Sequence, residues 1–212
     1  MVSRDFAVAN FVELEAAGPF EVTVQTGAKP GVHVEGNKAL VDRLKVDVDG
    51  DRLKIRTEHH DSWFGWHNST SGKARIMVTV PALRAATLAG AGGIHIDKVQ
   101  GDAFEGNIAG SGDLNIQSLQ VGHLKIGIAG SGSMSGTGKA QSAAYDIAGS
   151  GSVNGTAIDS EDLKVSIAGS GDVKVHATRA AKVDIMGAGD VEVTGGAKCS
   201  VSKMGGGDVR CS

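Results

Sequence analysis

Apolar and polar residues alternate along most of the chain, and this alternation predicts β-strands. Leu124, Ile126 and Ile128 occupy every second position, and the same spacing returns over residues 163–167. A period of two places successive side chains on opposite faces of a strand. In the first 87 residues the spacing recurs in shorter runs, at residues 20–24, 32–34, 44–48, 53–55 and 76–80.

A glycine-rich phrase recurs after position 87 and sets the period of the fold. Its copies begin at Leu88, Ile108, Ile128, Ile147, Ile167, Ile185 and Lys203, at intervals of 20, 20, 19, 20, 18 and 18 residues. Short strands at a near-constant interval, with no helical stretch between them, are typical of solenoids. The sequence therefore predicts an all-β fold, a single-stranded right-handed parallel β-helix (β-solenoid) with about 20 residues per coil. About ten stacked coils would be about 45–50 Å long.

The chain shows no linker, so we expect residues 1–212 to form one domain. Residues 88–212 supply the regular coils, and residues 1–87 supply irregular ones with a loop insertion at 57–73. Turn residues at 27–31 and 49–51 separate the N-terminal strands. Residues 38–45 have the pattern of a single helical turn.

The serines of the repeated phrase allow two arrangements. If the alternation continues through the phrase, Gly130 and Gly132 face inward and Ser131 faces outward, in a column with Ser111, Ser150 and Ser170. Alternatively, the phrase forms a sharp corner with glycine at positive φ and the serine tucked inward. The sequence alone leaves both open.

The composition narrows the class of protein. Glycine accounts for 32 of 212 residues without a Gly-X-Y register, which excludes collagen. With 21 basic and 24 acidic residues the net charge is −3, so we expect no nucleic-acid partner. No apolar run reaches the ~20 residues that span a bilayer, and the first residues lack the apolar segment of a signal peptide. Cys199 and Cys211 either form a disulfide in an oxidising compartment or remain two buried thiols.

A column of acidic residues marks the C-terminal coils. Asp172, Asp190 and Asp208 recur at one position of the repeat. Stacked about 4.8 Å apart, their carboxylates repel one another. They either splay into water, accept a lysine such as Lys174 between them, or bind a cation, for which calcium suits all-oxygen ligands. We expect solvated carboxylates here and therefore no cofactor, with calcium as the alternative.

Residues 59–67 concentrate aromatic and histidine side chains in a chain otherwise poor in both. The cluster contains His59, His60, Asp61, Trp63, Phe64, Trp66 and His67. Trp63 and Phe64 could cap an open edge of the solenoid. The same aromatic side chains could instead bind a sugar or a protein partner. A metal could also be held by His59, His60, Asp61 and His67, although adjacent histidines point apart and no two of the histidines are four residues apart.

Catalytic motifs do not stand out. The nucleophile elbow, the phosphate-binding loop and the dinucleotide fingerprint are absent. His33, His95, His123 and His176 are scattered singly along the chain. A polysaccharide-acting enzyme is therefore the least favoured function.

The residues resemble those of a known family. A strand at Phe20-Glu-Val-Thr-Val24, a second at Leu53-Lys-Ile55 and the serial Ala-Gly-Ser-Gly phrases are similar to the head GIN domain family, from about Phe6 to Cys211. The family is regarded as an autotransporter adhesin of Gram-negative bacteria. The resemblance implies a β-helix that is exported to the periplasm or cell surface, and it supplies no catalytic residues. We therefore expect a non-enzymatic envelope or surface protein that binds a glycan or a protein partner. The alternative is a structural unit that forms homo-oligomers by stacking solenoid ends or faces.

Overall fold

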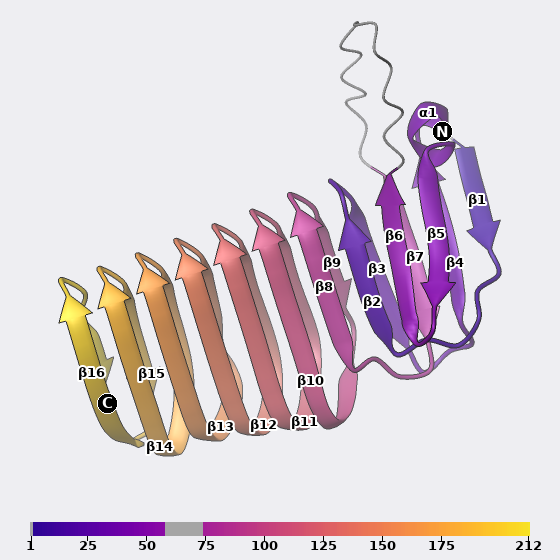
Figure 1. The fold of residues 1–212 in the computed structure, drawn as a ribbon. Coiled ribbons are helices and arrows are strands. Elements are labelled where there is room, and N and C mark those ends of the chain that lie inside the picture. The colour runs from indigo at the N-terminus through magenta and orange to yellow at the C-terminus, as the bar shows by residue number, and fades with distance from the viewer. Residues whose placement is uncertain (1, 58–73) are drawn as a thin grey trace, which may run out of the picture.

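The alternating pattern becomes a stack of β-strands in the computed structural model, which describes residues 2–57 and 74–212 (Figure 1). The N-terminal elements are β1 (Val2–Phe6), β2 (Glu13–Ala17), β3 (Glu21–Thr26), β4 (Gly31–Gly36), α1 (Lys38–Val41), β5 (Leu44–Asp49), β6 (Arg52–Thr57), β7 (Arg75–Val80), β8 (Ala85–Gly90) and β9 (Gly93–Ile96). The elements that follow are β10 (Val99–Gly110), β11 (Asp113–Gly130), β12 (Ser133–Gly149), β13 (Ser152–Gly169), β14 (Asp172–Gly187), β15 (Asp190–Thr194), β16 (Lys198–Gly205) and β17 (Val209–Cys211).

The strands form two main faces, here named face A and face B. Face A contains β5, β6, β2 and β8, followed by the last parts of β10 to β14 and then β16. Face B contains β1, β4, β7, β3 and β9, followed by the first parts of β11 to β14 and then β15 and β17. A shorter third face connects B to A within β11, β12 and β13, around residues 119–121, 138–140 and 158–160.

The stack is the expected β-solenoid, with about six turns roughly 20 residues apart. The strands from β8 onward pair in parallel. The expectation of about ten coils is too high, because β1, β4 and β5 pair antiparallel with their neighbours and extend the faces without adding turns. Asn37 caps the single helical turn α1, since its side-chain oxygen accepts a hydrogen bond from the backbone N–H of Ala39 at 3.1 Å.

Each glycine phrase makes the tight turn between face A and face B. Gly130 has φ +126°, and a Cβ there would lie 2.3 Å from the carbonyl oxygen of Gly110 in the coil beside it. Only glycine fits a backbone that is both left-handed and this close to its neighbour. Ser131 is exposed, as are the equivalent serines 111, 150 and 170. The turn thus combines features of both alternatives: the corner has positive φ, and its serine faces outward.

Residues on the inner sides of both faces form one hydrophobic core that extends along the stack from Phe11 to Val193. In the core, a large side chain of one coil packs where a neighbouring coil has a small residue. Tyr145 is buried, and a Cβ on Gly155 would lie 2.9 Å from its hydroxyl oxygen, so the glycine makes room for the ring. Burial raises the pKa of Tyr145. Fully burying one aliphatic or aromatic side chain stabilises a protein by about 1.5–3 kcal/mol, and here each turn adds several.

The C-terminal coil is closed by a disulfide between Cys199 and Cys211. Cys199 lies opposite Ala181 on face A, and Cys211 lies opposite Val193 on face B, so both occupy core-side positions. The bond therefore connects the two faces across the interior. Of the two states expected for these cysteines, the structure has the disulfide.

Candidate functional site

A column of small apolar side chains runs along the outer side of face A, and we name it the alanine strip. Its members are paired in register from coil to coil: Ala89, Ala109, Ala129, Ala148, Ala168, Met186 and Met204. The two methionines are the most exposed large apolar side chains of the described residues, at 64% and 71%. The strip follows from the repeat itself, because the alanine or methionine comes directly after the first, inward-facing position of each phrase and so points outward.

The alanine strip lines a groove with a volume of about 600 Å³. The neighbouring outward column consists of the short side chains of Asn107, Gly127, Asp146, Ser166 and Asp184, which also line the groove. Longer side chains stand in the next column, where Lys125, Lys164 and Lys182 follow one another around Ala144. The alanine strip thus forms an apolar floor, flanked by a column of short, mostly polar side chains and then by the column that contains the three lysines.

Charged side chains end the apolar column on its N-terminal side. The strip continues from Ala89 to Ala17, and the next position on face A is Arg56 in β6. Arg56 pairs with Asp47 at 3.4 Å.

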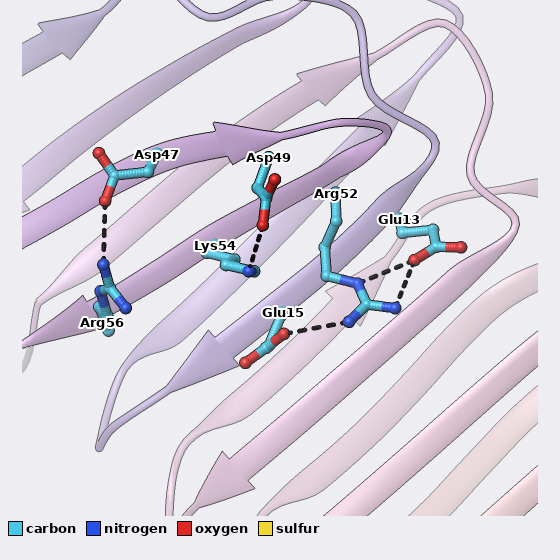
Figure 2. A network of polar contacts seen from close by, with 7 residues as sticks. All are labelled: Glu13, Glu15, Asp47, Asp49, Arg52, Lys54 and Arg56. Atoms are coloured by element: carbon cyan, nitrogen blue, oxygen red, sulfur yellow. Dashed lines mark hydrogen bonds and ion pairs between the residues drawn. The ribbon is translucent and has the colours of Figure 1, made fainter.

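The same surface of β2, β5 and β6 carries further ion pairs (Figure 2). Lys54 contacts Asp49 at 2.7 Å, and Arg52 contacts Glu13 at 2.8 Å and Glu15 at 3.6 Å. The hydrogen bond from Lys54 lowers the pKa of Asp49, and the bond to Glu13 raises the pKa of Arg52. These mutually neutralised charges cover the N-terminal part of face A and leave the apolar groove as its distinct feature.

The acidic column predicted from the repeat is present on face B. Asp172 and Asp190 are paired in register, and the backbone N–H of Asp208 donates a hydrogen bond of 2.8 Å to Asp190 Oδ1. Together with Lys174 and Arg210 they line a groove of about 300 Å³. Within the described residues, no three acidic, histidine or cysteine side chains converge as a metal site would require. Calcium binding here stays a hypothesis from the sequence.

The histidines of the described part lie apart and have different partners. His33 Nδ1 contacts Asp5 at 2.5 Å, and this hydrogen bond raises the pKa of His33. His123 Nδ1 contacts Ser142 Oγ at 2.7 Å. The next residue of that column is Asp162, which lies beyond the serine and is paired with Arg179, so its pKa is lowered. In a hydrolase triad the histidine stands between the serine and the acid. In this column the serine stands between the histidine and the acid, so the order differs from that of a triad.

The aromatic and histidine cluster of the sequence lies outside the described residues. Its members His59, His60, Trp63, Phe64, Trp66 and His67 therefore stay predictions. The strands on either side show where the segment is inserted: Arg56 pairs with Ala17 and Arg75 pairs with Glu21. Between these positions the neighbouring coil needs only residues 18–20, whereas this one contains residues 57–74. The described strands that flank the segment are β6 on face A, which ends at Thr57, and β7 on face B, which begins at Arg75.

Comparison with known proteins agrees with the geometry. Residues 10–197 match the family described as "Putative auto-transporter adhesin, head GIN domain". A crystal structure of a "putative adhesin" from Bacteroides fragilis superposes with a TM-score of 0.86 at 25% identity, covering 100% of this chain and 96% of that one. No curated protein matches the sequence.

Two more distant structures share the fold. A "putative lipid binding protein" from Parabacteroides distasonis has a TM-score of 0.75 at 23% identity, covering 100% of this chain and 96% of that one. A "putative adhesin" from Parabacteroides merdae has a TM-score of 0.70 at 18% identity, covering 100% of this chain and 95% of that one. Among the helices of the described part, none has the length and apolar character needed to span a membrane.

Proposed function

The chain belongs to the head GIN domain family, and from this membership we propose that it is a non-enzymatic adhesin-type binding protein, exported to the cell envelope or cell surface. The observation that carries the proposal is the groove over the alanine strip. It is preformed on stacked strands, so binding does not require the ordering of a loop. The order of the Ser142–His123 column, which differs from that of a triad, agrees with a protein that binds without catalysing a reaction.

A protein segment is the partner that best suits this groove. Its floor is made of methyl groups and backbone, which offer few hydrogen bonds to a sugar. Small side chains allow an extended segment to approach the sheet closely, and Met186 and Met204 can adapt to different apolar side chains. The aromatic segment, with Trp63, Phe64 and Trp66, is a second proposed contact for a glycan or protein, on the strength of its sequence alone.

A lipid is the second candidate ligand. The apolar floor of the groove would accept an acyl chain, and the basic column beside it would suit an anionic headgroup. Lys164 of that column makes no ion pair with any described residue, whereas Lys125 pairs with Glu105 at 3.3 Å. One of the structures that share the fold carries the description of a lipid-binding protein.

The test compares a charge placed inside the groove with one placed beside it. Ala148→Glu introduces a carboxylate in the middle of the alanine strip, and Ala144→Glu introduces one in the neighbouring basic column as a matched control. A third variant replaces both Trp63 and Trp66 with alanine. Each purified protein is measured by biolayer interferometry against immobilised extracellular-matrix proteins, bacterial envelope proteins, glycans and phosphatidylcholine vesicles with and without phosphatidylglycerol.

We expect the wild-type protein to bind a protein target and Ala148→Glu to bind it at least tenfold more weakly, with Ala144→Glu unaffected. Binding to vesicles alone would replace the protein partner by a lipid. Loss of binding only in the tryptophan variant would move the site to the aromatic segment. Undiminished binding by all three variants would refute both surfaces.

A further inference from the structure

One corner of the solenoid is recessed, and the recess originates in the repeat length. The interval between Ile128 and Ile147 is 19 residues, whereas the intervals before and after it are 20. In the structure the missing residue is located at the corner where face B meets the third face. Thr137 alone stands opposite residues 117–118 of β11, and Gly136 alone stands opposite residues 155–156 of β13. The corner of β12 is therefore one residue shorter than the corners on both sides of it.

The short corner forms the floor of a groove of about 370 Å³, which we name the corner groove. The floor is close to the neighbouring backbone, since a Cβ on Gly138 would lie 2.0 Å from the carbonyl oxygen of Leu119. The residues that line the groove come from three successive coils: Asn115, Ile116, Gln117, Ser135, Gly136, Thr137, Asn154, Thr156 and Ala157. Its volume lies within the range of about 300–1,000 Å³ that is typical of small-molecule sites.

All polar side chains in the corner groove are neutral, and much of their hydrogen-bonding capacity is unused. Asn115 Nδ2 donates to Ser135 Oγ at 2.8 Å, and Thr156 Oγ1 donates to Asn154 Oδ1 at 2.9 Å. Gln117 and Thr137 make no side-chain hydrogen bond with any described residue. An amide both donates and accepts, as does a hydroxyl. The groove therefore presents donors and acceptors side by side, together with the exposed apolar side chain of Ala157.

We propose that the corner groove binds a neutral saccharide chain that lies along the solenoid axis. Sugar hydroxyls donate and accept in the same way as the groove's amides and hydroxyls. Side chains at equivalent positions of successive coils are about 4.8 Å apart. This spacing is close to the advance per residue of an extended, β-linked polysaccharide. Consecutive sugar rings would thus meet Asn115, Ser135 and Asn154 in turn.

Other ligand classes fit the corner groove less well. A phosphate or an acidic glycan would need a cationic side chain, and none lines the groove. A peptide strand cannot add to the sheet here, because each of these strands already has a partner on both sides. The site is on a different surface from the alanine strip, so the inference does not depend on the proposed protein partner.

The experiment removes two groove amides and compares them with an amide elsewhere. Asn115→Ala/Asn154→Ala is the test variant, and Gln25→Ala in β3, an exposed amide away from both grooves, is the matched control. Binding is measured first on a printed array of neutral and acidic glycans, then by titrating ¹⁵N-labelled protein with the strongest neutral binder. The side-chain amide signals of Asn115, Gln117 and Asn154 report contact directly.

We expect neutral, extended glycans to bind and to shift these three amide signals. The double variant should bind at least about tenfold more weakly, since two neutral hydrogen-bonding groups are lost, and Gln25→Ala should bind like the wild type. The variant Ala148→Glu should also keep saccharide binding, which separates this site from the alanine strip. The proposal would be overturned if no neutral glycan bound, or if the double variant bound as tightly as the wild type.

Discussion

Breaking the disulfide of the last coil should loosen that coil and leave the rest of the stack intact. The bond joins Cys199 to Cys211, which are 12 residues apart and belong to opposite faces. Closing a loop of this length removes about 3 kcal/mol of chain entropy from the opened state. In a solenoid each coil contacts only its neighbours, so β16 and β17 depend on β14 and β15 alone. The loss should therefore appear as local opening.

Native-state hydrogen exchange measures this opening directly. A change of about 3 kcal/mol corresponds to about a 100-fold fall in protection, since each 1.4 kcal/mol is a factor of ten. We expect this fall for the amides of β16 and β17 in a Cys199→Ala/Cys211→Ala variant, and again in the wild-type protein under a phosphine reductant. The amides of β11 and β12 serve as the internal control and should keep their protection.

Two results would refute the reasoning. Unchanged protection in β16 would mean that the covalent link adds nothing to the stack. An equal fall in every coil would mean that the solenoid opens only as a whole, so that nearest-neighbour contacts do not describe it.

Three further predictions follow from single residues. Gly149→Ala should destabilise the fold by more than about 2 kcal/mol in denaturant melts, because φ is +126° and the new Cβ would lie 2.4 Å from the carbonyl oxygen of Gly130. As a control, Gly206→Ala should leave the stability nearly unchanged, because its new Cβ would meet no atom within 4 Å. His33 should titrate above its usual pKa in NMR because of its hydrogen bonds to Asp5 and Glu35, and Asp5→Asn should lower that pKa. Because the pKa of the folded state is the raised one, the stabilisation should be present below about pH 6.5 and lost as the pH rises through the folded value. Lys203→Ile should promote association that increases with protein concentration in sedimentation velocity. The sedimentation coefficient of the wild type should not change with concentration.

The regular part of the fold was predictable because the glycine phrase recurs in the sequence once per coil. Seven glycine phrases at nearly equal intervals fix both the coil length and the residues that face inward. The direction of the N-terminal strands was not predictable, since alternation is the same in parallel and antiparallel strands. For this reason the expected number of coils, about ten, included the antiparallel strands β4 and β5 as if each belonged to a separate coil.

The candidate sites differ in how far the sequence reveals them. The alternation of apolar and polar residues does not reveal the alanine strip, although each of its alanines directly follows a buried leucine or isoleucine. The interval of 19 residues was the signal for the corner groove, but only the pairing of Thr137 shows that the missing residue is at a corner. The acidic column was predicted correctly as a column, and its ability to bind a cation stays untested.

The charges at the two ends of the stack indicate which surfaces are available for partners. Arg4 lies opposite the buried Val34 on the edge strand β1, so it points to the core side, where it lies over the Phe6 ring at 4.9 Å. At the other end Lys203 lies opposite Ile185, and its Nζ donates to the carbonyl oxygen of Gly207 at 2.6 Å. A copy that stacked end to end would have to bury both cations. Inward-pointing charges of this kind keep sheet edges from pairing. The ends are therefore poor interfaces, and we expect partners to bind along the sides, where the alanine strip and the corner groove both cross several coils.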